Sequence, residues 1–203
     1  MVMRNAIMGI DASLTHTGVS VVSVDDSVHM ERTCVPKTMG VKRLIDIENW
    51  FNEFMTDMVP PSPLADTIEY NYYQIKSVVM EGYAYTPHFG NVFSLGELGG
   101  VLKRFFYRRE IPMYIVQPKT LKKWITGFGK GDKNMMLLKA FRKYNIEFSD
   151  DHTCDAYGLA MVGKALYDIE QGKTTLQSYM KYEQEVIKLI KGKVKKGLTI
   201  KPK

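Results

Sequence analysis

The chain reads NAIMGIDASLTHTGVSVVSV from residue 5 to residue 24, two apolar segments joined by a short polar link. Residues 5–11 and 17–24 have the continuous apolar runs of buried strands. Because the link at residues 12–16 is short, the two strands are predicted to form an antiparallel hairpin. Asp11 ends the first strand, and a carboxylate at the end of a buried strand is costly unless another group pairs with it.

Sequence periodicity predicts alternating elements along the rest of the chain. A third strand at 28–35 follows the hairpin, and a helix at 40–58 ends before the PPSP run at residues 60–63. Next come a strand at 75–81, a helix at 92–109, a strand at 111–116, and helices from 118, at 133–145, at 151–170 and at 174–190. This order predicts an α/β fold, a mixed five-stranded sheet flanked by helices on both faces, and it resembles the order in RNase H-like proteins.

Two acids end buried strands of the predicted sheet. Asp11 closes the first strand, and Glu81 closes the strand at 75–81. Taken alone, Asp11 has an ordinary alternative role, capping the turn at residues 13–17. If the two strands are adjacent, parallel and end together, both carboxylates could share one metal coordination sphere.

Further acids open the helix at 151–170, in the run DDHTCDA of residues 150–156. His152 and Asp155 are three residues apart, and Asp151 and Asp155 are four apart, so each pair shares a helical face. Acids are favoured in the first turn of a helix, which accounts for Asp150 and Asp151. Asp155 lies further along, beside the packed side of the helix, and therefore indicates function more strongly.

Four motifs, in order over residues 7–160, resemble those of the RuvC family of Holliday-junction resolvases. Residues 7–14 (IMGIDASL), followed by Thr17 and Gly18, resemble the family's opening GIDPSL…TG strand. Glu81 and the glycines within 96–101 are similar to its strand-end Glu and Gly-containing helix. Residues 121–133 (LKKWITGFGKGDK) resemble its VKK…TGxGxADK segment, and 152–156 (HTCDA) its last motif. Residues 56–74 and the chain beyond about 170 lie outside the resemblance.

The resemblance implies an enzyme that cuts DNA phosphodiesters with two Mg²⁺ or Mn²⁺ ions. Asp11, bridging both ions, would be joined as a ligand by Glu81 and Asp155. His152 would ligate an ion, position the attacking water, or do both, and Asp151 is an alternative ligand. These residue types suit hard divalent cations, which prefer oxygen ligands and can stabilise both oxygens of an in-line displacement. The nuclease domain is expected at residues 1–172, with a C-terminal helix and basic tail at 173–203.

Positive charge is concentrated in two segments of a chain whose net charge is +6. Residues 119–133 hold five lysines and one acid, and residues 188–203 hold seven lysines and no acid. Such clusters indicate a polyanionic partner, although a solvated lysine face and a disordered tail would look the same. The resemblance places Lys122 and Lys133 beside the scissile phosphate, so that Lys133 joins the catalytic set.

Aromatic residues add to the expected DNA contacts. The family often carries a hydrophobic or aromatic residue just past the Glu that probes the junction centre, and here Tyr83 or Tyr85 would take that role in a shifted register, by stacking on a base. Trp124 is predicted to lie in the core and Phe128, between two glycines, on the surface. The expected nucleic-acid contacts are Lys119, Lys122, Lys123, Lys130, Lys133, Tyr83, Tyr85 and Phe128.

Other features exclude several classes of protein. No apolar run approaches the roughly 20 residues that span a bilayer, and the N-terminus lacks a signal-peptide pattern. Two cysteines, Cys34 and Cys154, form no disulfide framework. A cytoplasmic location is expected, in the host cytoplasm if the chain is encoded by a phage.

The expected partner is branched DNA, in particular a four-way junction. The two-fold symmetry of a junction favours a homodimer, with the helices near 92–109 and 133–145 as candidate contacts. A broader flap or branched-DNA nuclease on the same fold is the main alternative, and a non-catalytic DNA-binding protein is a second. An ATPase of the sugar-kinase or actin type would need two lobes, for which 203 residues are too few.

Overall fold

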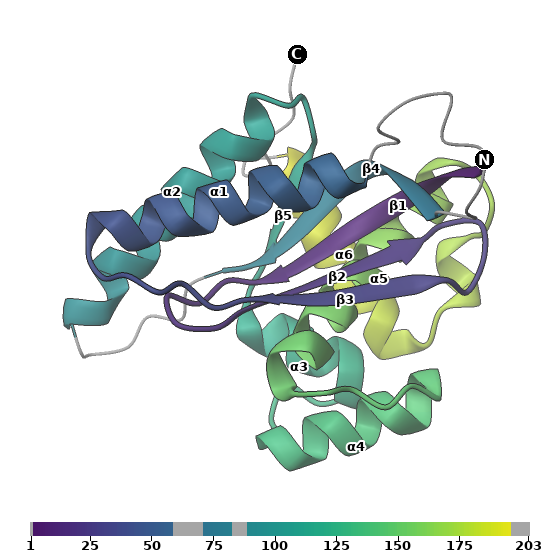
Figure 1. The fold of residues 1–203 in the computed structure, drawn as a ribbon. Helices are drawn as coiled ribbons and strands as arrows, with labels where there is room; N and C mark the ends of the chain where they lie inside the picture. Colours follow the sequence, from purple (N-terminus) through teal and green to yellow (C-terminus); the bar gives the residue numbers. More distant parts are fainter. Residues whose placement is uncertain (1, 59–70, 83–88, 196–203) are drawn as a thin grey trace.

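The computed structural model describes residues 2–58, 71–82 and 89–195 of the chain. Its centre is a five-stranded sheet of order β3-β2-β1-β4-β5 (Figure 1). The first three strands, β1 (Val2–Asp11), β2 (Thr17–Ser23) and β3 (His29–Cys34), form an antiparallel meander. The other two, β4 (Asn71–Glu81) and β5 (Met113–Val116), run parallel to β1. The predicted mixed five-stranded sheet is therefore confirmed.

Helices cover both faces of the sheet, as predicted (Figure 1). On one face, Ala6, Met8 and Ile10 of β1 pack in a core with α1 (Val41–Asp57) and α2 (Phe89–Tyr107). On the other face, Ile7 packs in a second core with α5 (Asp151–Glu170). Because side chains alternate along a strand, Asp11 projects to the same face as Ile7, toward α5.

Two shorter helices, α3 (Pro118–Thr126) and α4 (Lys133–Tyr144), follow β5 and pack beside α5. Gly127 ends α3 in the left-handed conformation, with φ of 82°. Asp132 begins α4, where its carboxylate accepts a hydrogen bond of 2.8 Å from the backbone N–H of Met135. The loop at residues 127–131 is therefore fixed at both ends by helix caps.

The C-terminal part of the chain differs from the prediction. Instead of one helix at 174–190, a short 3₁₀ helix at Leu176–Ser178 precedes α6 (Lys181–Lys195). Gly172, with φ of 69°, follows the end of α5, and the carboxylate of Glu183 accepts a hydrogen bond from the N–H of Met180 at the start of α6.

The basic segment at 188–203 is not all tail, because α6 continues to Lys195 and Ile190 is buried in the core. Residues 196–203 lie outside the described part of the chain. Within the described ranges, no helix is both long and apolar enough to cross a bilayer.

Candidate active site

The two strand-end acids lie side by side. In the parallel pairing of β1 with β4, Ile10 is opposite Met80, so Asp11 and Glu81 are the next residues on neighbouring strands. Asp11 is only 8% exposed, and its carboxylate is hydrogen bonded to that of Glu81. The expectation that these two strands end together is confirmed.

Close packing of α5 on the sheet brings His152 and Asp155 close to Asp11. A Cβ atom on Gly9 would lie 1.9 Å from the backbone oxygen of Ala156, and one on Gly18 would lie 2.4 Å from that of His152. Any side chain at these two positions would push α5 away from β1 and β2. The glycines thus set the distance between Asp11 and the first turn of α5.

The first turn of α5 is held by a reciprocal cap. The carboxylate of Asp150 accepts a hydrogen bond of 2.7 Å from the N–H of Thr153, and the Thr153 hydroxyl pairs with the N–H of Asp150. This capping box fixes the direction in which His152 projects. Nδ1 of His152 lies 2.6 Å from Oδ2 of Asp11, and this hydrogen bond raises the pKa of the imidazole.

A pocket of about 220 Å³ opens beside these residues. Acids line it from three elements, Glu81 of β4, Asp151 and Asp155 of α5, and Asp132 at the start of α4, and the same pocket is lined by Lys122 and Lys133. Lys133 forms an ion pair with Asp151, which lowers the pKa of that carboxyl. Nζ of Lys122 donates a hydrogen bond of 3.1 Å to the backbone oxygen of Gly131.

Burial and mutual repulsion perturb the acids of this site. Burial raises the pKa of Glu81, and the neighbouring carboxyls of Asp11 and Asp155 raise it further. Burial likewise raises the pKa of Asp155 to about 7, with Asp11 and Asp151 adding to the effect. Like charges held close together in a partly dry site bind either protons or cations.

The donor chemistry of the cluster suits a divalent cation, although its side chains are not arranged around one. Among the residues that the structure describes, no group of three or more His, Cys, Asp or Glu side chains is set to hold a metal ion. Instead, Asp11 pairs with His152 and with Glu81. Burial, together with repulsion from neighbouring acids, raises the pKa of Glu81 and of Asp155, and a bound cation would offset both effects.

The remaining predicted DNA contacts form two groups. Lys119, Lys123, Lys130 and Phe128 line a second pocket next to α6, described below. Phe128 is 67% exposed and Trp124 is buried, as predicted. Tyr83 and Tyr85 lie outside the described residues, so their predicted role is not tested.

One residue of the site, His16, was not predicted. Its Nε2 lies 3.2 Å from Oδ2 of Asp150, and its ring centroid is 4.8 Å from that of His152. The link at residues 12–16 therefore contacts the start of α5. In the sequence, only its place just after the strand-end Asp11 pointed to His16.

The strand order β3-β2-β1-β4-β5, with helices on both faces of the sheet, defines an RNase H-like fold. Comparison with known proteins narrows this class. The chain is 29% identical over 134 residues to the crossover junction endodeoxyribonuclease RuvC of Corynebacterium jeikeium, a match that covers 64% of this chain and 74% of that protein. No protein-family model matches the chain.

Solved structures give the same result for the fold. A RuvC structure from Thermus thermophilus matches with a TM-score of 0.58, and T. thermophilus RuvC in complex with a Holliday junction substrate matches with 0.59. Each match has 18% sequence identity and covers 82% of this chain and 96% of the other. The chain is therefore RuvC-like, in sequence by one comparison and in fold by the others.

Proposed function

We propose that the chain is a metal-dependent endonuclease that resolves four-way DNA junctions. The observation that carries this proposal is the convergence of Asp11, Glu81, His152 and Asp155 at the carboxyl ends of β1 and β4, beside a pocket that two lysines also line. The RuvC relatives add support, since one is named a crossover junction endodeoxyribonuclease and another was solved with a Holliday junction.

Asp11, Glu81 and Asp155 would hold two Mg²⁺ or Mn²⁺ ions. When bound, such a pair of ions activates a water molecule and stabilises the charge that develops on the scissile phosphate. Asp151 is the less suitable ligand, because Lys133 already engages its carboxylate. His152 would orient Asp11 through Nδ1, and as a ligand or a water-positioning group it would act through its other ring nitrogen.

The lysines would bind the substrate. Lys122 and Lys133 line the same pocket as the acids, where they can neutralise the phosphate that enters it. Lys119, Lys123 and Lys130 extend the positive surface along α3 and the loop that follows. Contacts of this kind hold the DNA backbone in register without reading its sequence.

We also keep the proposed division of the chain, with the nuclease fold at residues 1–172 and an addition at 173–203. Val186, Ile187 and Ile190 are buried, so α6 packs on the nuclease core as part of one body.

A cytoplasmic location and the choice of Mg²⁺ are further parts of the proposal. A broader flap nuclease is the alternative that the same site would serve.

The test is cleavage of a labelled four-way junction, a flap and a linear duplex, each with Mg²⁺ and with EDTA. We expect Mg²⁺-dependent, symmetric cutting of the junction, and preferential cutting of the flap would favour the alternative.

Asp11→Asn should abolish cleavage while junction binding is retained or improved, because a negative charge near phosphate is removed. An Asp11→Asn protein that cuts at the wild-type rate would refute the assignment.

A further inference from the structure

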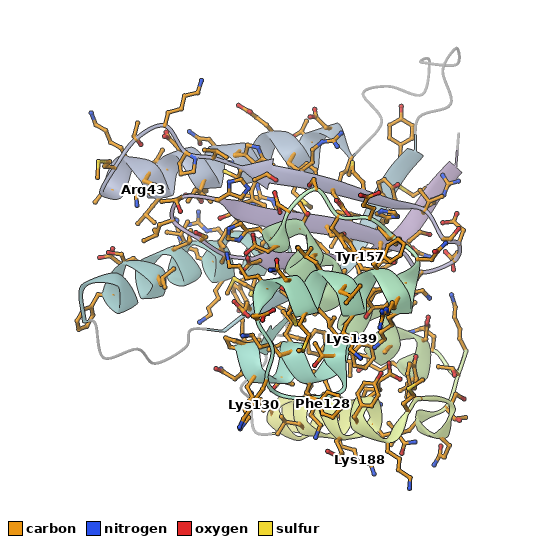
Figure 2. All side chains as sticks on the ribbon, turned by 90° about the horizontal axis from the view of Figure 1, so that it is seen from below. Arg43, Phe128, Lys130, Lys139, Tyr157 and Lys188 are labelled. Atoms are coloured by element: carbon orange, nitrogen blue, oxygen red, sulfur yellow. The ribbon has the colours of Figure 1, made fainter. Side chains whose placement is uncertain are left out.

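A second pocket, of about 680 Å³, lies between α3, the loop at 127–131 and α6. It shares no lining residue with the pocket of the acids. Its walls combine an aromatic ring, aliphatic side chains and lysines, from Phe128, Val186, Leu189, Lys119, Lys123 and Lys130. Figure 2 shows Phe128 and Lys130 next to each other at this edge of the molecule, beside α6. We call it the α3–α6 pocket.

The loop presents Phe128 in a fixed position. The hydroxyl of Thr126 donates a hydrogen bond of 2.6 Å to the backbone oxygen of Phe128 and lies 3.0 Å from its N–H. Gly127 takes the left-handed conformation that this tight turn needs. The backbone of Phe128 is thus anchored to Thr126, while the residue is 67% exposed and leaves its ring accessible to a flat partner.

Positive charge surrounds the ring. Lys119 and Lys130 are exposed. The aliphatic part of the Lys119 side chain lies against Gly129, since a Cβ atom added to Gly129 would be 3.1 Å from Cγ of Lys119. Lys123 instead forms an ion pair with Glu185 of α6, which ties the two walls of the pocket together. The pocket therefore offers one aromatic face and two exposed cations.

The α3–α6 pocket is also linked to the acids through the chain. Asp132 and Lys133, two and three residues after Lys130, line the acid pocket. Lys122, on the helix that precedes the loop, is hydrogen bonded to the oxygen of Gly131. A DNA strand that leaves the acid pocket along this loop would meet Phe128.

We propose that the α3–α6 pocket binds an unpaired nucleotide of the substrate, with the base stacked on Phe128 and its phosphates beside Lys119 and Lys130. The proposal rests on the proposed nuclease function and adds to it a site for single-stranded DNA. Stacking on an aromatic ring tolerates any base, because every base has a π-face, and flanking lysines supply affinity for the backbone. Continuity with the acid pocket favours DNA over an acidic peptide.

The test uses Phe128→Trp as a reporter and needs no cleavage. In EDTA, a short oligothymidylate should quench the fluorescence of the new tryptophan, and an abasic oligonucleotide of equal length should not. The two native tryptophans, Trp50 and Trp124, also fluoresce, so the wild-type protein measured with the same oligonucleotides supplies the background signal. Phe128→Ala should weaken oligothymidylate binding about tenfold, within the range known for base–aromatic stacking.

Two controls match the variants in exposure. Met180 is 64% exposed and does not line the pocket, so Met180→Ala should leave oligothymidylate affinity unchanged. Lys130→Ala should reduce the affinity for both oligonucleotides, whereas Lys37→Ala, on an exposed loop, should reduce neither. Junction cleavage by the wild-type protein is measured in a separate assay. A protein that does not cleave junctions would then contradict the proposed nuclease function without contradicting nucleotide binding in the α3–α6 pocket.

Three results would overturn the proposal. Equal quenching by the abasic oligonucleotide would mean that only phosphate is bound. Unchanged affinity in Phe128→Ala would remove the stacking contact. Tighter binding of an acidic peptide than of oligothymidylate, lost in Phe128→Ala, would make the pocket a protein-docking site.

Discussion

At the scale of single residues, the acids of the site act as a coupled group whose charge depends on what is bound. Asp11 contacts His152 directly and is hydrogen bonded to Glu81, and repulsion among the acids extends to Asp155. In the absence of a cation, bound protons would offset part of this negative charge. Stability and metal binding should therefore be linked through the same carboxyls.

The metal-free protein should lose stability as the pH rises. The pKa of Asp155 is raised from 3.8 to about 7 in the folded state, so its stabilising contribution is complete below 3.8 and is lost as the pH passes through about 7. Glu81 and His152 have raised pKa values too and contribute with the same sign. In EDTA, the melting temperature should fall by several degrees between about pH 5 and about pH 8.

Asp155→Asn supplies the control, because its amide does not titrate. This variant should show a flatter decline in melting temperature over the same pH range, measured by calorimetry. Added Mg²⁺ should stabilise the wild-type protein more at about pH 8 than at about pH 5, since protons compete with cations for the carboxyls. A wild-type melting temperature that rises with pH in EDTA would contradict the pKa directions.

Lys133 should matter more for cleavage than for binding. Its side chain is 76% exposed and reaches Asp151 across the acid pocket. Lys133→Ala should slow single-turnover cleavage by on the order of tenfold or more, because a cation at the reacting phosphate stabilises developing charge. Junction affinity in EDTA should fall by less than the cleavage rate does, and the magnitude of the slope of log K against log salt should be reduced by about one. A matched loss in Lys37→Ala would show that the effect is general electrostatics.

At the scale of elements, α5 determines where the site forms. It lies on the sheet without intervening side chains at Gly9 and Gly18, so its capped first turn reaches the end of β1. Sequence reasoning found the apolar strands, the helix from 151 and the acids, because strand ends and helix starts have local signals. It missed His16, whose role depends on contacts with residues more than 130 positions away.

The C-terminal region shows the other limit of sequence reasoning. The segment at 174–180 is TTLQSYM, and its predicted helix is replaced by a 3₁₀ turn. Serine and threonine compete with helical hydrogen bonds, and the carboxylate of Glu183 caps the true start of α6. The lysines of 188–195 led to the prediction of a basic tail, whereas this segment is part of a packed helix. The burial of Ile190 depends on tertiary contacts, which cannot be predicted from a count of charges.

Gly9→Ala tests the close approach of α5. A Cβ atom at this position would overlap the backbone of Ala156, which cannot move without shifting the helix. We expect a loss of at least about 1–3 kcal/mol in the free energy of unfolding, measured by urea denaturation. Gly96→Ala is the control, since a Cβ atom in its place on α2 meets no atom within 4 Å, and alanine should stabilise the helix slightly. Equal stability of both variants would mean that α5 is not held this closely.

At the scale of the whole molecule, the described residues form one acid cluster, whereas the proposed resolution of a junction requires two cuts. Exposed apolar side chains remain on both helices that the sequence suggested as contacts. On α2, Phe93 and Tyr107 are 71% and 52% exposed, and on α4, Leu138 and Phe141 are 49% and 47% exposed. Exposed groups of this kind mark candidate interfaces without choosing between them.

We therefore expect two chains per junction, related by a two-fold axis. An isologous dimer would present two acid clusters with matching geometry to the two strands that must be cut. Sedimentation of the protein alone and with a junction measures this directly, and Phe93→Asp and Phe141→Asp identify the helix at the interface. The variant that disrupts the dimer should leave single nicks in place of paired cuts, because each chain keeps its acids. A wild-type protein that binds as one chain per junction would instead favour the flap-nuclease alternative, since a flap has no two-fold symmetry and needs a single cut.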